Sequence, residues 1–104
     1  MASSEANVAL SETVVNIEER AFSCNTKLTS INIPSTVEYI GGSAFEYCQS
    51  LTEIFISKSV TKVDTHCFYE SGQLTVYCEA KNKGSDWSSF WNIQNRPVIW
   101  SAKK

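Results

Sequence analysis

The sequence is poor in the residue types that usually mark a chemical or membrane function. It has one histidine, one methionine and two prolines among 104 residues. Nine lysines and arginines against eleven aspartates and glutamates give a net charge of −2, so no basic surface for nucleic acid is expected. No apolar run approaches the roughly 18–20 residues needed to span a bilayer. We therefore expect neither a nucleic-acid partner nor membrane insertion.

The four cysteines do not form a metal-binding motif. They stand at Cys24, Cys48, Cys67 and Cys78, with no C-x-x-C pair and a single histidine, His66, in the chain. A zinc site needs four ligands brought together, commonly in close pairs. We therefore expect no metal site and no cofactor.

The main feature that is present is an internal repeat with a 23-residue period. Residues 14–36 and 37–59 align without gaps, and a third copy starts at Val60. The first two copies share eight residues, seven of them apolar: Val14/Val37, Ile17/Ile40, Ala21/Ala44, Phe22/Phe45, Leu28/Leu51, Thr29/Thr52, Ile31/Ile54 and Ile33/Ile56. A period of this size is typical of a solenoid, in which each coil buries its apolar set against its neighbours.

The third copy keeps the same apolar positions until one residue is missing. Beyond Leu74, Val76 and Cys78 therefore take the places of Ile54 and Ile56. The repeat predicts one core column formed by Phe22, Phe45 and Phe68. It also turns Cys48, Cys67 and Cys78 inward, where free thiols behave as small apolar side chains.

The repeated pattern V-x-x-I-x-x-x-A-F-x-x-C-x-x-L-T-x-I-x-I-P, over residues 8–78, resembles the BspA-type leucine-rich repeat. The resemblance implies a right-handed superhelix of β-rich coils with a short strand in each repeat. It also implies arrays on bacterial and protist surface proteins, and hence a role in adhesion or recognition.

We predict a single domain over residues 1–104, a β-rich α/β solenoid. It comprises a partial repeat (1–13), three repeats (14–36, 37–59 and 60–78) and a C-terminal cap (79–104). In the cap, Ser85–Trp91 is expected to be a short helix with Trp87, Phe90 and Trp91 on one side, followed by a strand at Val98–Trp100. The Gly41-Gly42 pair is expected to take positive φ in a tight turn.

The segment Leu-Thr-x-Ile-x-Ile alternates as a half-buried strand does. Its outward positions form three predicted columns, which are Ala9/Asn32/Phe55/Tyr77, Asn7/Ser30/Glu53/Thr75 and Ser11/Pro34/Ser57/Glu79. Exposed aromatic residues on a rigid sheet are typical binding anchors. The residues predicted to contact a protein partner, on a host or cell surface, are Asn32, Glu53, Phe55, Thr75 and Tyr77. The strands offer a few hundred Å², against about 800 Å² per partner in a typical interface, so binding by this face alone is expected to be weak.

No catalytic set is expected, because the repeat turns Cys67 inward and His66 outward. We therefore interpret the chain as a non-enzymatic protein-interaction module. Two alternatives remain open. One is a structural spacer or end-cap that forms a weak homodimer through its open N-terminal coil. The other is an intracellular binding or inhibitor protein.

The N-terminal sequence leaves the compartment open. The residues MASSEANVALSE lack the basic start and apolar core of a signal peptide. A cytoplasmic location is expected if Met1 is the native start, and an extracellular or cell-surface location if the chain is part of a longer protein. We favour the second, because the sequence opens in the middle of a repeat.

Overall fold

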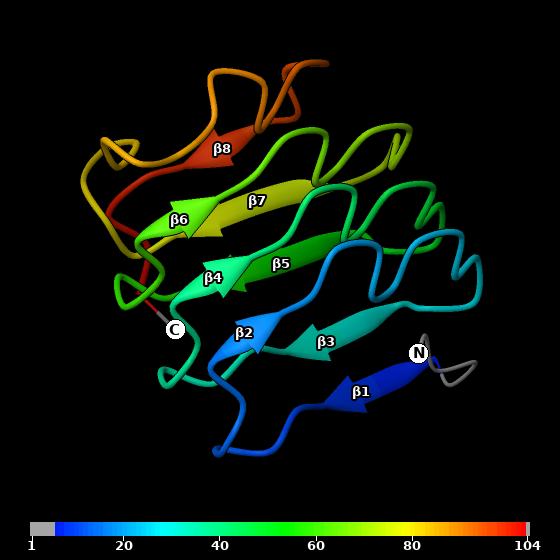
Figure 1. Cartoon of the computed structure of the whole chain (residues 1–104). Coiled ribbons are helices and arrows are strands. Elements are labelled where there is room, and N and C mark those ends of the chain that lie inside the picture. Colours follow the sequence, from blue (N-terminus) through cyan, green and yellow to red (C-terminus); the bar gives the residue numbers. More distant parts are fainter. Residues whose placement is uncertain (1–5, 104) are drawn as a thin grey trace.

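The computed structural model describes residues 6–103, which wind into a β-solenoid of about four turns (Figure 1). Residues 1–5 of the predicted partial repeat and Lys104 lie outside the described residues. The strands are short and pair only in parallel. They are β1 (Asn7–Ala9), β2 (Asn16–Ile17), β3 (Ser30–Asn32), β4 (Tyr39–Ile40), β5 (Glu53–Ile56), β6 (Lys62–Val63), β7 (Thr75–Cys78) and β8 (Val98–Ile99).

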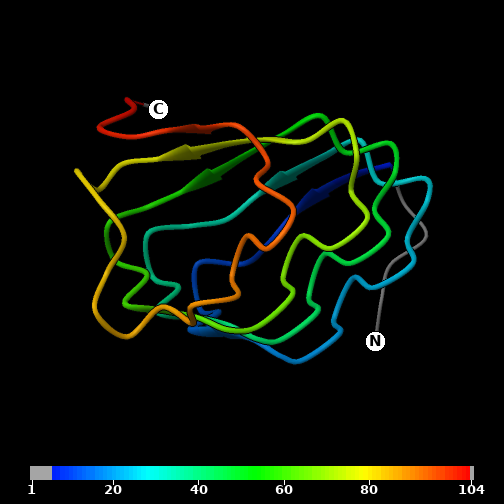
Figure 2. The same cartoon turned by 90° about the horizontal axis from the view of Figure 1, so that it is seen from above.

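The strands form two columns on opposite sides of the solenoid. One column contains β1, β3, β5, β7 and β8, and the other contains β2, β4 and β6; viewed along the stack, the turns overlie one another (Figure 2). In the second column Ile17, Ile40 and Val63 pair in sequence at the full repeat period. In the first column Ile54 pairs with Val76, so the step there is one residue shorter than the period. This register confirms the prediction that one residue is missing from the third repeat.

The core is a stack of equivalent side chains, and the predicted phenylalanine column is confirmed. The rings of Phe22 and Phe45 are 5.4 Å apart with an interplanar angle of 5°, and those of Phe45 and Phe68 are 5.9 Å apart at 13°. Around the column, the repeated apolar positions are almost completely buried. They include Leu28, Val37, Ile40, Leu51, Val63, Leu74 and Val76. Each turn thus removes its apolar side chains from water only by lying on the next turn.

A second buried column, Asn25, Cys48 and Ser71, joins the turns through hydrogen bonds. The Ser71 hydroxyl donates to the Phe45 carbonyl oxygen at 2.6 Å and accepts the Cys48 N–H at 3.0 Å. The Cys48 thiol donates to the Phe22 carbonyl oxygen at 3.1 Å. These bonds satisfy backbone groups that would otherwise be buried without a partner. The column also shows that Asn25, and not its neighbour Cys24, occupies the repeat position of Cys48.

The predicted burial of three cysteines is confirmed. Cys48, Cys67 and Cys78 are free thiols that are fully buried, whereas Cys24 is exposed. Burial raises the pKa of Cys48 to about 11 and the pKa of Cys67 and Cys78 to about 12, because the apolar surroundings disfavour the thiolate. The three thiols therefore remain protonated and chemically inert near neutral pH.

The expected positive φ at Gly41 and Gly42 is wrong. No described glycine has a positive φ. Six of the eight left-handed residues form two repeated columns with φ between 58° and 62°, namely Arg20/Ser43/His66 and Cys24/Tyr47/Glu70, and the other two are Asn95 and Ser101. Gly41 serves close packing instead, because an added Cβ would lie 2.5 Å from the Glu19 nitrogen of the preceding turn.

The helix predicted at Ser85–Trp91 is also wrong: this segment forms a series of turns, and the described residues contain no helix. The chain instead follows the path of the preceding turn. The His66 N–H donates to the Phe90 carbonyl oxygen at 3.0 Å, and the Ser88 N–H donates to the Val63 carbonyl oxygen at 2.8 Å. These bonds to the neighbouring turn replace the bonds that a helix would form within itself.

Residues 14–36, 37–59 and 60–78 form the first three turns, and the fourth turn, which follows residue 78, covers the third. Trp91 stands one repeat period after Phe68 and packs against it edge to face at 6.2 Å. Trp91 and Trp87 are 7% and 4% exposed, with ring centroids 4.9 Å apart. Phe90, however, is 54% exposed, which contradicts its expected place on the same face as the tryptophans. That residues 79–104 terminate the array stays a prediction.

Two residues of the third outward column are not on the surface. Pro34 is buried and Ser57 is 7% exposed. Both follow a strand at the point where the chain turns, as shown by hydrogen bonds from Val37 N to Pro34 O at 3.1 Å and from Val60 N to Ser57 O at 3.0 Å. The alternation of a strand therefore does not extend to these positions.

Candidate binding face on the strand side

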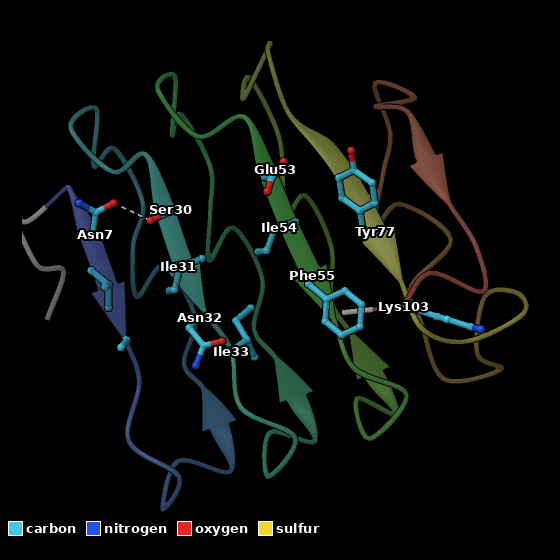
Figure 3. Close-up of a pocket in the computed structure, with 12 residues that line it drawn as sticks. Asn7, Ser30, Ile31, Asn32, Ile33, Glu53, Ile54, Phe55, Tyr77 and Lys103 are labelled. Carbon is cyan, nitrogen blue, oxygen red and sulfur yellow. Dashed lines mark hydrogen bonds between the residues drawn. The ribbon is translucent and has the colours of Figure 1, made fainter.

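The outward side of β1, β3, β5, β7 and β8, called here the strand face, carries a hollow. The hollow has a volume of about 620 Å³. Its lining includes the apolar side chains of Val8, Ile31 and Ile54. Figure 3 shows Ile31 on β3 and Ile54 on β5, with the polar side chains of Asn32 and Glu53 on the same strands. The remaining lining residues are Asn7, Ala9, Ser30, Asn32, Ile33, Glu53, Phe55, Tyr77 and Lys103.

A discontinuity in the sheet explains the position of the hollow. The strands β1 and β3 form one sheet, and β5, β7 and β8 form another, so the ladder is interrupted between β3 and β5. On the opposite side of the solenoid, β2, β4 and β6 pair without a break. The interruption leaves Ile31 only half-buried, whereas Ile54 is 1% exposed. The gap between β3 and β5 is therefore lined by apolar side chains, and polar side chains of the two strands stand at its borders.

Each predicted partner-binding residue can be located on this face. Four of them, Asn32, Glu53, Phe55 and Tyr77, line the hollow. Thr75 pairs in register with Glu53 but is not a lining residue. The register also places Phe55 directly beside Tyr77, as the columns predicted. Both aromatic side chains are half-buried, so they are less exposed than expected.

The sequence reasoning missed two residues of the strand face, Ile99 and Lys103, and it placed Asn7 in an outward column but not among the partner-binding residues. Ile99 pairs with Tyr77 and is 47% exposed, so it extends the aromatic column by one strand. Asn7 accepts a hydrogen bond from the Ser30 hydroxyl at 2.6 Å and belongs to the polar wall of the hollow. Lys103 is a lining residue because the chain bends back after β8, where Ala102 N donates to Cys78 O at 2.9 Å. Repeating the step from Phe55 to Tyr77 once more would have identified Ile99.

On the opposite column of strands, the polar side chains are already engaged with one another. The Tyr39 hydroxyl donates to the Asp64 carboxylate at 3.1 Å, and the Lys62 ammonium lies 5.5 Å from the centre of the Tyr39 ring. A hydrogen bond from the Thr65 N–H is the main cause that lowers the pKa of Asp64. Partial burial, followed by the bond to Asp64, raises the pKa of Tyr39. These side chains already bind one another, so the strand face is the better candidate for an external partner.

The structure separates the one histidine from its neighbouring cysteine. The Cys67 thiol is fully buried and lies 3.0 Å from the Asp64 carbonyl oxygen and 3.1 Å from that of Gly41. The His66 ring stacks instead on Tyr69 with centroids 5.2 Å apart. A nucleophile and its base must be within hydrogen-bond reach of each other, and these two side chains engage different partners. The pair therefore provides no nucleophilic site.

Residues 6–103 contain neither a metal-binding cluster nor a membrane-spanning helix. No group of three or more histidine, cysteine, aspartate or glutamate side chains is placed to bind a metal ion. None of the segments there forms a helix long and apolar enough to cross a membrane.

Comparison with protein families supports the fold and the repeat assignment. The BspA type leucine rich repeat region matches residues 2–95 in six copies. Curated proteins and solved structures gave no match. The family match covers most of the chain and includes the turns described above, from β1 to the tryptophan-rich segment. The chain belongs to the BspA-type leucine-rich repeat family.

Proposed function

We propose that the chain is a non-enzymatic protein-interaction module of a cell-surface repeat array, used in adhesion or recognition. Repeat proteins of this kind act as interaction scaffolds, and a rigid stack displays side chains without having to order its backbone on binding. The observation that carries the proposal is the strand-face hollow, in which half-buried aromatic residues stand beside an apolar gap. Its partner is a protein on a host or cell surface.

The roles of the residues follow from their positions. Phe55 and Tyr77 provide flat apolar area at one side of the hollow, where aromatic anchors contribute most to binding. Asn32 and Glu53 stand on the two strands that border the gap and supply polar contacts that orient the partner. Thr75 extends the polar column beside Glu53. The small area favours a weak contact for one module and a stronger one for several linked modules.

The proposal is tested with a double variant, Phe55→Ala/Tyr77→Ala. Immobilised protein is incubated with extracted cell-surface proteins, captured proteins are identified, and one purified candidate is then titrated against each variant. We expect the double variant to weaken binding at least tenfold, because aromatic anchors dominate such interfaces. Circular dichroism and thermal unfolding must first show that the double variant is folded.

The matched control is Tyr47→Ala. Tyr47 is 39% exposed but lies outside the strand face, in the loop that precedes β5. Loss of binding in the strand-face variant with retention in the control supports the site. Equal affinity of the wild type and the strand-face variant contradicts it.

A further inference from the structure

Exposed large apolar side chains occur in both the first and the last turn of the solenoid. Two of the most exposed large apolar residues belong to the fourth turn, Phe90 at 54% and Ile93 at 44%. Val15, in the first turn, is 44% exposed. Apolar side chains that gather in this way mark contact surfaces more often than scattered ones do.

The first-turn end is also hollowed. A cavity of about 270 Å³ opens there, between the apolar side chains of Leu10, Val14, Ile17, Ala21 and Phe22 and the charged residues Glu18, Glu19 and Arg20. In the second turn the equivalent positions Val37, Ile40 and Ala44 are completely buried, because the first turn covers them. The cavity therefore has the shape and polarity of a surface on which another turn fits.

Charge is divided along the stack. Residues 6–56 contain six carboxylates and two cations, a net charge of −4: Glu12, Glu18, Glu19, Glu38, Glu46 and Glu53 against Arg20 and Lys27. Residues 57–103 contain four carboxylates and six cations, a net charge of +2: Asp64, Glu70, Glu79 and Asp86 against Lys58, Lys62, Lys81, Lys83, Arg96 and Lys103. Like ends of two copies repel each other, and unlike ends attract.

Strand direction also favours contact between unlike ends. The described edges of the two columns are β1 and β2 at one end and β8 and β6 at the other, and every observed pairing is parallel. A second copy moved along the stack, without being turned over, brings its β1 beside β8 of the first copy with the strands parallel. Two like ends placed together would have to pair their strands antiparallel, and both would carry net charge of the same sign.

We propose that copies of this chain associate head to tail, with the fourth-turn end of one copy seated on the first-turn end of the next. The contact joins two different surfaces, so it does not close at a dimer. The number of copies in each assembly should therefore increase with protein concentration. The contact uses the ends of the solenoid and leaves the strand face free. The molecule measures 31 × 31 × 23 Å. An end of this size can supply the area of about 800 Å² per partner that a specific contact needs.

The first test is the mass of the protein in solution. Sedimentation velocity and light scattering are recorded over a wide concentration range in low salt and in about 0.5 M salt, where charges are screened beyond a few Å. We expect the average mass to rise past that of a dimer and to fall when salt is added. A monomer at every concentration overturns the proposal, and so does a mass that stops at two copies.

The second test uses charge reversal at each end. The variant Glu18→Lys/Glu19→Lys changes the first-turn end, and Lys81→Glu/Ile93→Glu changes the fourth-turn end; all four side chains are exposed. Each variant alone should associate at least tenfold more weakly than the wild type. In an equal mixture, the native fourth-turn end of one variant can contact the native first-turn end of the other. The two altered ends carry opposite charges and can also contact each other, so the mixture should regain association.

The control for net charge is Glu38→Lys, an exposed position in the second turn and away from both ends. It should leave association within about twofold of the wild type. Failure of the mixture to associate contradicts a head-to-tail contact, as does normal association of either folded end variant alone. Tryptophan fluorescence and circular dichroism establish that each variant is folded before it is used.

Discussion

The first and second turns have nearly the same apolar pattern but bury it to different degrees. Val37 is completely buried in the second turn, whereas its equivalent Val14 is half-buried in the first. Ala44 is likewise completely buried, and its equivalent Ala21 is only partly buried. The sequences do not account for this difference, because the residues are the same or similar. Burial in this fold depends on having a neighbour on both sides, so stability is shared between turns and does not belong to each one.

The largest expected effect is the loss of the central aromatic ring. Phe45→Ala should lower the free energy of unfolding by about 3–5 kcal/mol, because Phe45 is 0% exposed and has a stacked ring on each side. Phe22→Ala should cost less, since Phe22 has one such neighbour and is 7% exposed. Urea denaturation measures both values. Equal losses would show that position in the stack does not matter.

A smaller loss is expected where two turns come closest. In Gly41→Ala the new Cβ would stand 2.5 Å from the Glu19 nitrogen and 2.7 Å from the Glu18 carbonyl carbon, both backbone atoms that cannot move alone. Separating the turns should cost about 1–3 kcal/mol. The matched control is Gly72→Ala, where nothing lies within 4 Å of an added Cβ. A control that is destabilised as strongly as Gly41→Ala would reject close packing as the cause.

The free energy of unfolding should fall at high pH because the buried thiols resist ionisation in the folded state. Folding raises the pKa of Cys67 and Cys78 from 9.0 to about 12, so above pH 9 the folded chain binds more protons than the unfolded one. Their contribution is complete below pH 9 and is lost as pH rises toward 12. Each thiol should lower the free energy of unfolding by about 1.4 kcal/mol per pH unit within this range.

The variant Cys67→Ala isolates this effect from the titration of tyrosines. Its unfolding free energy should fall less steeply between pH 9 and pH 11 than that of the wild type, as measured by urea denaturation at several pH values. Identical slopes would mean that Cys67 is not shielded from water in solution.

Much of the fold could be predicted because the repeat fixes which side chains share a column. The stacked phenylalanines, the buried cysteines and the register of Phe55 with Tyr77 all follow from the repeat period and one missing residue. The strand face could be placed for the same reason. These features depend on side-chain spacing, which is visible in the sequence.

The errors arose where backbone interactions between turns prevailed over local patterns. Trp87, Phe90 and Trp91 have helical spacing, but the segment bonds to the preceding turn at Val63 and His66. Counting one repeat period from Phe68 reaches Trp91 and would have indicated the correct path. The residue pattern does not indicate the interruption between β3 and β5, and so it does not indicate the hollow. Whether two strands pair depends on the distance between whole turns.

Native-state hydrogen exchange tests the central comparison most directly, because it measures the stability of each turn separately. The amides of Gly41 and Phe45 donate to Ile17 O at 2.7 Å and Cys67 O at 2.8 Å, and those of Leu10 and Val14 donate to Asn32 O at 3.2 Å and Ser11 O at 3.0 Å. We predict that Gly41 and Phe45 exchange only on global unfolding and that Leu10 and Val14 exchange through openings of lower free energy. Equal protection of both pairs, or greater protection of the first turn, would contradict the account.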